Sequence, residues 1–502
     1  MHSTPIRFIL PIVLTATLAA QVHEARYETR AVSYDSGYLP ATARPDRVLL
    51  TTVRAPGGLW LRLRFGTLTN LPQGSRLVLT STRDQAVQYF DAISLLEYRL
   101  GSAYFNGDEV GLVLEVPAGA QRARVQVDAM EIGQPDLAAI GPTTICGPTD
   151  DRQRSTDPRQ GRQYPTGCSS WLINEFTVLT AGHCSATAAQ QVHFNVPLST
   201  SSGGLVLPPP QDQYPYDTAT LQRLDAGVGS DWTVTTTVRN SNTRQYPGQK
   251  QGSWYALGSV PSSPTGQNIR ITGYGTVSSP VSLTWQQVQK THLGTLNTIA
   301  ATSLCYATDT TGGNSGSPII HENTGKAIGI HTHGGCTATS GCNSGTRVDR
   351  ADLQASISSR TVLKSVGKWS TFGSSCAGTV GTGSLLGGGY PDLGFQPTLN
   401  VTGVRQNQIG AMFLGSSNTT WGSNSLPYDL SAIGMTGCAL RTSSEVALAI
   451  GTGTGAPSLT LTIPVNLALR GLKFYAQYAN ADAGANLLGV VVTNGLQGLI
   501  GD

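Results

Sequence analysis

Short runs of alternating apolar and polar residues, separated by glycine- and proline-rich turns, recur along most of this chain. The clearest runs are residues 59–65, 110–116, 123–128, 458–463 and 472–477. Successive side chains of a β-strand point to opposite faces of the sheet, so a period of two indicates half-buried strands. The 59 glycines and 27 prolines suit short strands joined by tight turns. We therefore predict an all-β protein, with one short helix within residues 84–97.

The chain of 502 residues is too long for one hydrophobic core. Changes in composition predict four regions: an N-terminal β-sandwich at 25–140, a polar linker at 141–163, a central region at 164–367 and a C-terminal β-sandwich at 373–502. Neither flanking region carries a pattern of nucleophile and base. We expect the N-terminal region to be an accessory domain or a pro-domain. We expect both flanking regions to be suited to binding a surface or a polysaccharide.

The first twenty residues have the pattern of a signal peptide. Arg7 precedes the apolar run 8–20, which ends in small residues and is short for a membrane span. The alternative is an N-terminal membrane anchor, but no longer apolar segment follows. We expect residues 1–20 to be removed and the protein to be secreted, extracellular and without a transmembrane anchor.

The charge balance argues against one class of partner. Charged residues make up 13% of the chain, and the net charge is only +3. Binding to nucleic acid requires clustered lysine and arginine, and the sequence has no such cluster. We therefore expect no nucleic-acid partner.

Eight cysteines, an even number, fit an oxidising compartment and allow 105 pairings. Cys336 and Cys342 are separated by five residues in one glycine-rich loop and are expected to pair. Cys376 and Cys438 are the two cysteines of the last third of the chain and are expected to form a bridge there. No paired CxxC spacing indicates a metal site, so we expect neither a metal nor a cofactor.

Two segments carry the residues of a nucleophilic reaction. Leu-Thr-Ala-Gly-His-Cys occupies 179–184, and Thr-Thr-Gly-Gly-Asn-Ser-Gly-Ser-Pro occupies 310–318. A serine hydroxyl becomes an effective nucleophile when a neighbouring base removes its proton. Glycines beside it let backbone N–H groups turn towards an oxygen that becomes negative during acyl transfer. We therefore predict that Ser315 is the nucleophile and His183 its base.

Both segments resemble the signatures of chymotrypsin-like serine peptidases, and Gly273-Tyr274-Gly275 resembles the turn that opens the second barrel of that family. The resemblance covers the central region only. It implies two successive β-barrels with a His–Asp–Ser triad between them, and hydrolysis of protein or peptide substrates through an acyl-enzyme. Asp231 is predicted as the third member because residues 230–234 resemble the family's aspartate followed by an alternating buried strand, whereas the alternatives Asp217 and Asp225 lie in more turn-like contexts.

The resemblance also implies the surroundings of the nucleophile. The N–H groups of Gly313 and Ser315 would form the oxyanion hole. Trypsin and chymotrypsin carry an aspartate just before the nucleophile, where it pairs with a newly cut N-terminus, but here that residue is the neutral Asn314. Activation through that salt bridge is therefore not expected.

The family's histidine-loop disulfide corresponds to Cys168 and Cys184, which bracket the His183 segment. That pairing, with the two above, leaves Cys146 and Cys305 as partners by elimination.

The strand 329–335 looks most like that of glutamyl endopeptidases, in which a histidine, here His331, meets an acidic substrate side chain. Thr310 matches a hydroxyl position of the same pocket. Asp309, in contrast, stands six residues before Ser315, where trypsin keeps the aspartate that selects Arg and Lys. We favour cleavage after Glu, with Arg or Lys specificity as the alternative.

Other residues of that strand have expected roles as well. Thr332 would donate a hydrogen bond to Asp231, and the Gly334 backbone would pair with the substrate strand. His331, His333 and Cys336 also have the spacing of metal ligands on one strand face, but we favour the pocket-wall interpretation. A second hypothesis for the whole protein is a protease-like binding or adhesion protein in which activity is incidental.

Overall fold

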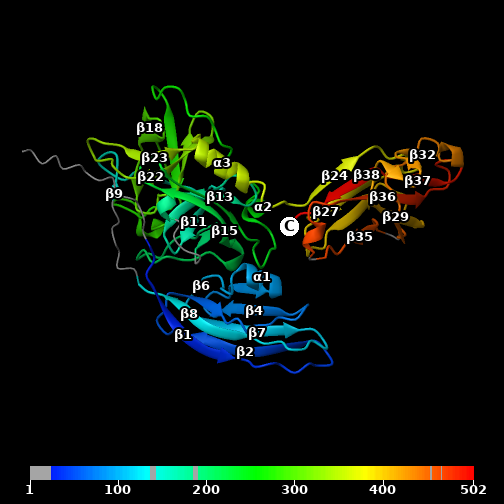
Figure 1. The fold of residues 1–502 in the computed structure, drawn as a ribbon, viewed down its shortest axis with the longest axis horizontal. Coiled ribbons are helices and arrows are strands. Elements are labelled where there is room, and N and C mark those ends of the chain that lie inside the picture. Colours follow the sequence, from blue (N-terminus) through cyan, green and yellow to red (C-terminus); the bar gives the residue numbers. More distant parts are fainter. Residues whose placement is uncertain (1–23, 136–142, 185–189, 453–454, 465) are drawn as a thin grey trace, which may run out of the picture. The chain divides into compact units, whose positions relative to one another are not determined.

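The computed structural model describes residues 24–135, 143–184, 190–452, 455–464 and 466–502. The predicted signal peptide lies outside these residues. The chain forms two compact units, Met1–Thr361 and Val362–Asp502 (Figure 1). The described part is mostly β, as predicted, and none of its helices has the length and apolar character needed to cross a bilayer.

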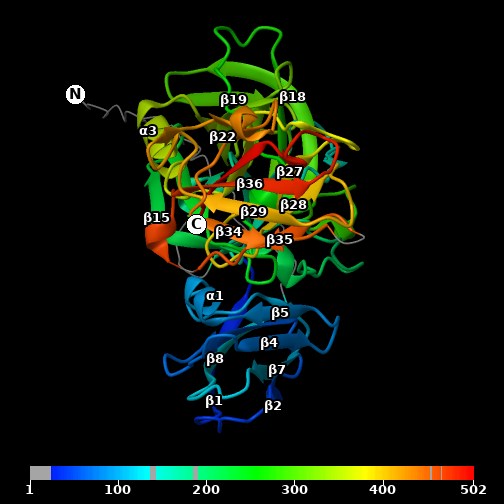
Figure 2. The ribbon, with the colours of Figure 1, turned by 90° about the vertical axis from the view of Figure 1, so that its right-hand side faces the viewer.

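The N-terminal region is a sandwich of two antiparallel four-stranded sheets, which Figure 2 shows as layers. One sheet is β1 (Tyr27–Asp35), β8 (Gln126–Gly133), β3 (Trp60–Phe65) and β6 (Phe105–Asn106); the other is β2 (Asp46–Arg54), β7 (Glu109–Val116), β4 (Arg76–Ser81) and β5 (Val87–Phe90). Every second residue of β7 is buried, so the alternation seen in the sequence places Val110, Leu112 and Leu114 in the shared core.

The predicted helix of this region is α1 (Ala92–Glu97). Asp91 precedes it and accepts the Ser94 N–H at 2.7 Å, while the Ser94 hydroxyl accepts the Asp91 N–H at 3.0 Å. Such reciprocal capping satisfies N–H groups that a helix start otherwise leaves without partners.

The central region contains two closed six-stranded barrels, as the resemblance implied. The first is β11 (Gln160–Tyr164), β12 (Cys168–Leu172), β13 (Thr177–Thr180), β16 (Asp231–Thr237), β15 (Gln213–Asp225) and β14 (Gln191–His193). The second is β18 (Lys290–Ile299), β17 (Asn268–Gly273), β21 (Pro318–His321), β22 (Lys326–His333), β23 (Asn343–Arg347) and β19 (Ser303–Ala307), closed by pairing of β19 with β18. Helix α2 (Pro247–Gln251) lies between the barrels in sequence, and α3 (Ala351–Arg360) follows them.

The segment 141–163 differs from the linker that its polar composition predicted. It contains β9 (Thr143–Thr144), which pairs with β20 (Thr310–Thr311), and β10 (Gln153–Arg154), which pairs with β18. Its last residues form most of β11, the first strand of the first barrel. The linker prediction is therefore wrong for these residues, and the barrel region begins earlier than residue 164.

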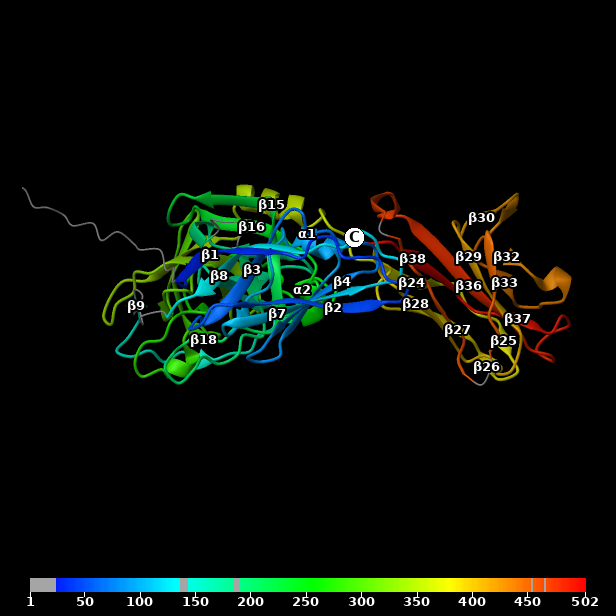
Figure 3. The same cartoon turned by 90° about the horizontal axis from the view of Figure 1, so that it is seen from below.

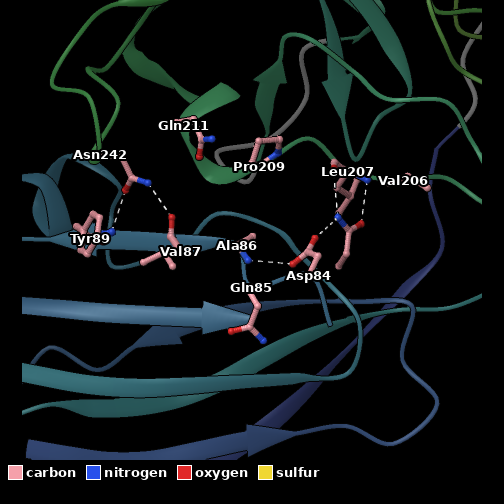
Figure 4. A pocket seen from close by; sticks show the side chains of 11 residues that line it. Asp84, Gln85, Ala86, Val87, Tyr89, Val206, Leu207, Pro209, Gln211 and Asn242 are labelled. Carbon is pink, nitrogen blue, oxygen red and sulfur yellow. Dashed lines mark hydrogen bonds between the residues drawn. The ribbon is translucent and has the colours of Figure 1, made fainter. Parts of the chain in front are cut away.

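The sandwich and the first barrel share a polar interface. The Gln213 side chain donates to the Tyr104 carbonyl and accepts the Tyr104 N–H, both at 2.8 Å. Figure 4 shows Asn242, whose side chain accepts the Tyr89 N–H at 2.8 Å and donates to the Val87 carbonyl at 2.7 Å. Asn242, Tyr89 and Val87 also line a cavity of about 510 Å³ between β5 and the barrel. Side-chain amides thus satisfy backbone groups across the interface.

The C-terminal unit packs a larger antiparallel sheet against a smaller one around a common core (Figure 3). The larger sheet is β24 (Lys368–Phe372), β38 (Gly495–Leu499), β36 (Lys473–Ala481), β29 (Gly410–Gly415) and β34 (Val446–Ala449), with β37 (Val490–Val492) paired to β36. The smaller is β27 (Ser384–Gly388), β28 (Thr398–Thr402) and β35 (Ser458–Thr460). Three two-residue hairpins complete it: β25 (Ala377–Gly378) with β26 (Gly381–Thr382), β30 (Thr420–Trp421) with β31 (Asn424–Ser425), and β32 (Tyr428–Asp429) with β33 (Ala439–Leu440).

Candidate active site

Strand pairing in the first barrel brings Asp231 to His183. Residue Thr180 at the end of β13 lies opposite Thr233 of β16, and Asp231 begins β16. His183 follows in a single 3-10 turn, η1 (Gly182–Cys184). The Asp231 carboxylate is fully buried and lies 2.6 Å from His183 Nδ1.

The second carboxylate oxygen of Asp231 is held by the backbone. It accepts the N–H of Gly182 at 2.5 Å and that of His183 at 3.1 Å. A side chain at position 182 would collide with the Leu224 carbonyl, 1.9 Å from where its Cβ would lie, so glycine is required there. The carboxylate is therefore oriented before any substrate arrives.

This arrangement selects one form of the histidine ring. With Nδ1–H donating to Asp231, the neutral imidazole keeps its lone pair on Nε2. Among the described residues, His183 Nε2 is buried and has no hydrogen-bond partner. Nε2 is thus the ring atom able to take a proton.

Ser315 lies on the turn between β20 and β21, against the segment that carries His183. A side chain on the next residue, Gly316, would come within 2.3 Å of Thr180 Oγ1 and 3.2 Å of the Ala181 N. The Ser315 hydroxyl donates to the Thr332 carbonyl of β22 at 3.3 Å, and the Ser315 carbonyl accepts the Ser169 N–H at 2.8 Å. Both barrels therefore position the serine.

The peptide groups before Ser315 have a defined orientation. Gly313 has φ +100°, and a Cβ there would lie 2.7 Å from the Tyr274 carbonyl, which excludes other residues. The Gly312 carbonyl accepts the Thr276 N–H at 2.8 Å. Because the C=O and N–H of a trans peptide point in opposite directions, the Gly313 N–H points away from Thr276.

His331 lies fully buried on β22, and its Nδ1 is 2.6 Å from the Tyr306 hydroxyl. Burial, followed by repulsion from His333 and His183, lowers the pKa of His331 to about 3. Burial also raises the pKa of Tyr306 well above its usual value, so the phenol keeps its proton. Tyr306 was not singled out from the sequence, because its alternating strand gave no sign that the hydroxyl meets a histidine.

Asp309 is engaged with the segment around Cys146. Its carboxylate accepts the Cys146 N–H at 2.7 Å and the Asp151 N–H at 3.4 Å. Burial raises the pKa of Asp309. Thr310, beside it, is held through Oγ1 by the Asn343 side-chain amide and by Thr144 Oγ1, each at 2.8 Å.

Asn343 was also missed by sequence reasoning. Its amide group donates to the carbonyls of Thr308 and Thr144, and its oxygen accepts the N–H groups of Gly335 and Cys336. A lone asparagine in a glycine-rich loop gives no sequence signal for such a role.

One expectation for β22 is wrong. No hydrogen bond joins Thr332 to Asp231 in the described structure; the Thr332 hydroxyl donates to the Ser344 carbonyl at 3.4 Å and lies 2.9 Å from His333 Nδ1. The backbone of residues 182 and 183 supports the aspartate instead. His333 Nδ1 lies 3.9 Å from Asp231 Oδ2, and burial lowers its pKa.

Two of the four predicted disulfides are present and two are wrong. Cys168 pairs with Cys184, and Cys376 with Cys438, as expected. Instead of Cys336–Cys342 and Cys146–Cys305, the structure has Cys146–Cys336 and Cys305–Cys342. The reason is that the segment before β10 folds back beside the loop after β22, which places Cys146 next to Cys336. Since Cys336 is oxidised, it is not available as a metal ligand beside His331 and His333.

Known proteins resemble the region that contains this site. Residues 148–352 match the family model described as Trypsin, and this region belongs to the trypsin family of chymotrypsin-like serine peptidases. The chain is 24% identical over 269 residues to "Glutamyl endopeptidase" of Bacillus licheniformis, covering 48% of this chain and 77% of that protein. It is 29% identical over 235 residues to a Bacillus subtilis protein named "Extracellular metalloprotease", covering 42% and 68%.

Two solved structures are also similar to parts of the chain. One is a Glu endopeptidase in complex with MPD, with 19% identity, coverage of 43% of this chain and 98% of that chain, and a TM-score of 0.33. The other is neuropsin, a serine protease of mouse brain, with 17% identity, coverage of 42% and 99%, and a TM-score of 0.32. On the strength of the family match over residues 148–352, the protein is a trypsin-like serine endopeptidase that acts on peptide substrates.

Proposed function

We propose that Ser315, His183 and Asp231 are the catalytic residues. His183 Nε2 takes the proton of the Ser315 hydroxyl during attack and returns it to the leaving amine. Asp231 holds the ring and stabilises the imidazolium. The observation that carries the assignment is the 2.6 Å contact between His183 Nδ1 and Asp231, which directs the lone pair of Nε2 away from the aspartate.

We propose that the N–H groups of Gly313 and Ser315 bind the oxyanion. The Gly312 carbonyl is occupied by Thr276 and the Asn314 carbonyl by Ser317, so both following N–H groups point the other way. Donors fixed before the reaction stabilise the developing charge without reorganisation. The Gly334 backbone, directly after β22, would pair with the extended substrate.

We propose that the enzyme cleaves after glutamate and that His331 reads the substrate carboxylate, with Thr310 in the same pocket. Because Tyr306 keeps its proton, its hydroxyl donates to Nδ1 and leaves the hydrogen of the neutral ring on Nε2. That N–H can donate to a substrate carboxylate. The hydrogen bond is stronger than one to a neutral oxygen, because the acceptor is charged. The Asp309 carboxylate accepts the N–H groups of Cys146 and Asp151. These bonds argue against Asp309 as the residue at the bottom of the pocket that would bind an Arg or Lys side chain. The named glutamyl endopeptidase relative supports the same preference.

Peptides that vary only at the residue before the cut test this specificity. We expect kcat/KM after Glu to exceed that after Gln, Arg or Lys, and His331→Ala to reduce it by roughly 10²-fold or more for Glu, since a buried charge loses its partner. Asp309→Asn, which keeps the shape, is the matched control and should change the ranking little. A preference for Arg or Lys would contradict the acidic pocket, while hydrolysis by Ser315→Ala near the wild-type rate would contradict the nucleophile.

We also propose that the protein is secreted. Four disulfides persist in oxidising compartments, and one named relative is extracellular. Recovery of the protein, cut after the predicted signal peptide, from the medium of a secreting host would test this. The two flanking regions remain proposed accessory domains, and binding of each to polysaccharides or cell surfaces is measurable by pull-down.

A further inference from the structure

Asn314, the residue before the nucleophile, is part of a buried polar network. It is 1% exposed, and its side-chain oxygen accepts the Thr311 N–H at 3.0 Å and Arg152 Nη1 at 3.1 Å. In trypsin and chymotrypsin, an aspartate at this position pairs with a new N-terminus. Here the cation comes from a side chain inside the chain.

Arg152 itself is held in one orientation. Its side chain is 1% exposed, and Asp150 accepts from Nε at 2.8 Å and from Nη2 at 2.5 Å. A fork of this kind fixes the guanidinium plane, because both bonds must form together. The remaining donors therefore point in set directions, towards the loop that carries Ser315.

Those donors reach both sides of the oxyanion loop. Nη1 also donates to the Thr311 hydroxyl at 2.9 Å, and Nη2 donates to the Thr276 carbonyl at 2.8 Å. The Thr276 N–H in turn holds the Gly312 carbonyl. Arg152 thus supports Asn314 on one side of Gly313 and, through Thr276, the Gly312 peptide on the other.

The segment that carries Arg152 is anchored independently of what precedes it. The Cys146–Cys336 disulfide ties it to the loop after β22, and β10 pairs with β18 immediately after Arg152. The Cys146 N–H also bonds to Asp309. A cut before β9 would leave these contacts unchanged.

We propose that Arg152, oriented by Asp150, is the positioning residue of the oxyanion hole. Its guanidinium would hold the loop before Ser315 in place, as the newly cut N-terminus does in trypsin. The loop before Ser315 then adopts its working form without a free amino terminus nearby. This inference rests on the proposed function of Ser315 and Gly313. Lys290 is another buried basic side chain near the loop, but its Nζ donates to the carbonyls of Gly275, Trp285 and Val288 and not to Asn314.

The test compares the full chain with the double variant Asp150→Asn/Arg152→Met, which removes the cation without leaving a buried unpaired carboxylate. Arg154→Met is the matched control, since Arg154 is two residues away, partly buried, and donates to the Gln289 and Ser155 carbonyls. Asn314→Ala approaches the same contact from the loop and keeps the ion pair. The measurements are kcat and KM for one peptide, the inhibition constant of a peptidyl boronate that forms a tetrahedral adduct, and the midpoint of thermal unfolding.

We expect kcat to fall at least about 10-fold, with loss of boronate affinity in parallel and KM within about threefold, because the oxyanion donors act mainly in the transition state. Arg154→Met should leave all three values near those of wild type. A folded double variant with wild-type kcat and boronate affinity would overturn the inference. If that variant does not fold, Asn314→Ala decides by the same criteria. If the assignment of Ser315 as the nucleophile were itself wrong, the result would be different, because Ser315→Ala would then retain activity.

Discussion

Asp231→Asn is the sharpest test of the triad, because the substitution changes one atom of a fully buried side chain. One carboxylate oxygen accepts two backbone N–H groups, from Gly182 and His183. An amide NH₂ placed there would face two donors, so the amide oxygen must take that side. The NH₂ group then faces His183 Nδ1.

The consequence for the histidine is a change of tautomer. An amide donor opposite Nδ1 requires a lone pair on that atom, which moves the ring proton to Nε2. Nε2 then cannot accept the proton of Ser315. In triads of this kind the same loss of tautomer lowers kcat by about 10⁴, equivalent to about 5.4 kcal/mol of activation free energy. The hydrogen bonds of the folded state are retained, so we expect the free energy of unfolding to change little.

The assay is kcat for a peptide with Glu before the cut, together with denaturant unfolding of each variant. Asp225→Asn and Asp217→Asn are matched controls. Asp225 is exposed and Asp217 half-buried, and the carboxylate that contacts His183 Nδ1 is that of Asp231. Both should keep the wild-type kcat. A larger loss in either control than in Asp231→Asn, or a small loss in Asp231→Asn with the fold intact, would refute the assignment.

Three further outcomes are expected. First, His331 has a folded-state pKa of about 3, below the usual 6.5 of a histidine, so at intermediate pH the unfolded chain binds a proton that the native ring does not. The free energy of unfolding should therefore fall as the pH drops from 6.5 towards 3. His331→Gln should reduce this fall, as measured by urea unfolding at pH 7 and pH 4.5. An equal fall in the variant would contradict burial of a neutral ring. Second, Cys146→Ala/Cys336→Ala should lower the free energy of unfolding by about 2–5 kcal/mol, and non-reducing peptide mapping of the wild type should recover a Cys146–Cys336 fragment; a Cys336–Cys342 fragment would contradict the pairing described above. Third, a chain ending at Thr361 should keep the wild-type kcat/KM, since the triad and the pocket lie in the first unit; a large loss of activity in this folded fragment would show that the C-terminal unit takes part.

The features that were predictable from the sequence are those encoded locally. The alternation of β7 and the capped helix after Asp91 follow from short-range patterns, and His183 and Ser315 stand in compact motifs. The linker prediction failed because a solvated linker and a buried segment can have the same content of Asp, Arg and Pro. Here Asp150 and Arg152 form a buried ion pair.

The wrong disulfides have a related cause. Cys146 and Cys336 are 190 residues apart, and their contact depends on β9 pairing with β20. A two-residue strand has no sequence pattern of its own. Proximity along the chain favoured Cys342 as the partner of Cys336, and the fold of the second barrel reverses that choice by placing Cys305 opposite Cys342.

The interface between the sandwich and the first barrel determines what a cut between them would do. The sandwich contains no cysteine, so the backbone is its one covalent connection to the barrels. A break between Gly133 and Thr143 would leave the bonds of Gln213 to Tyr104 and of Asn242 to β5 intact. The nicked enzyme would therefore behave as a heterodimer: one peak in native size-exclusion chromatography and two bands in a denaturing gel. In such an enzyme the first chain is a subunit, and its departure would require a denaturant and not merely a protease.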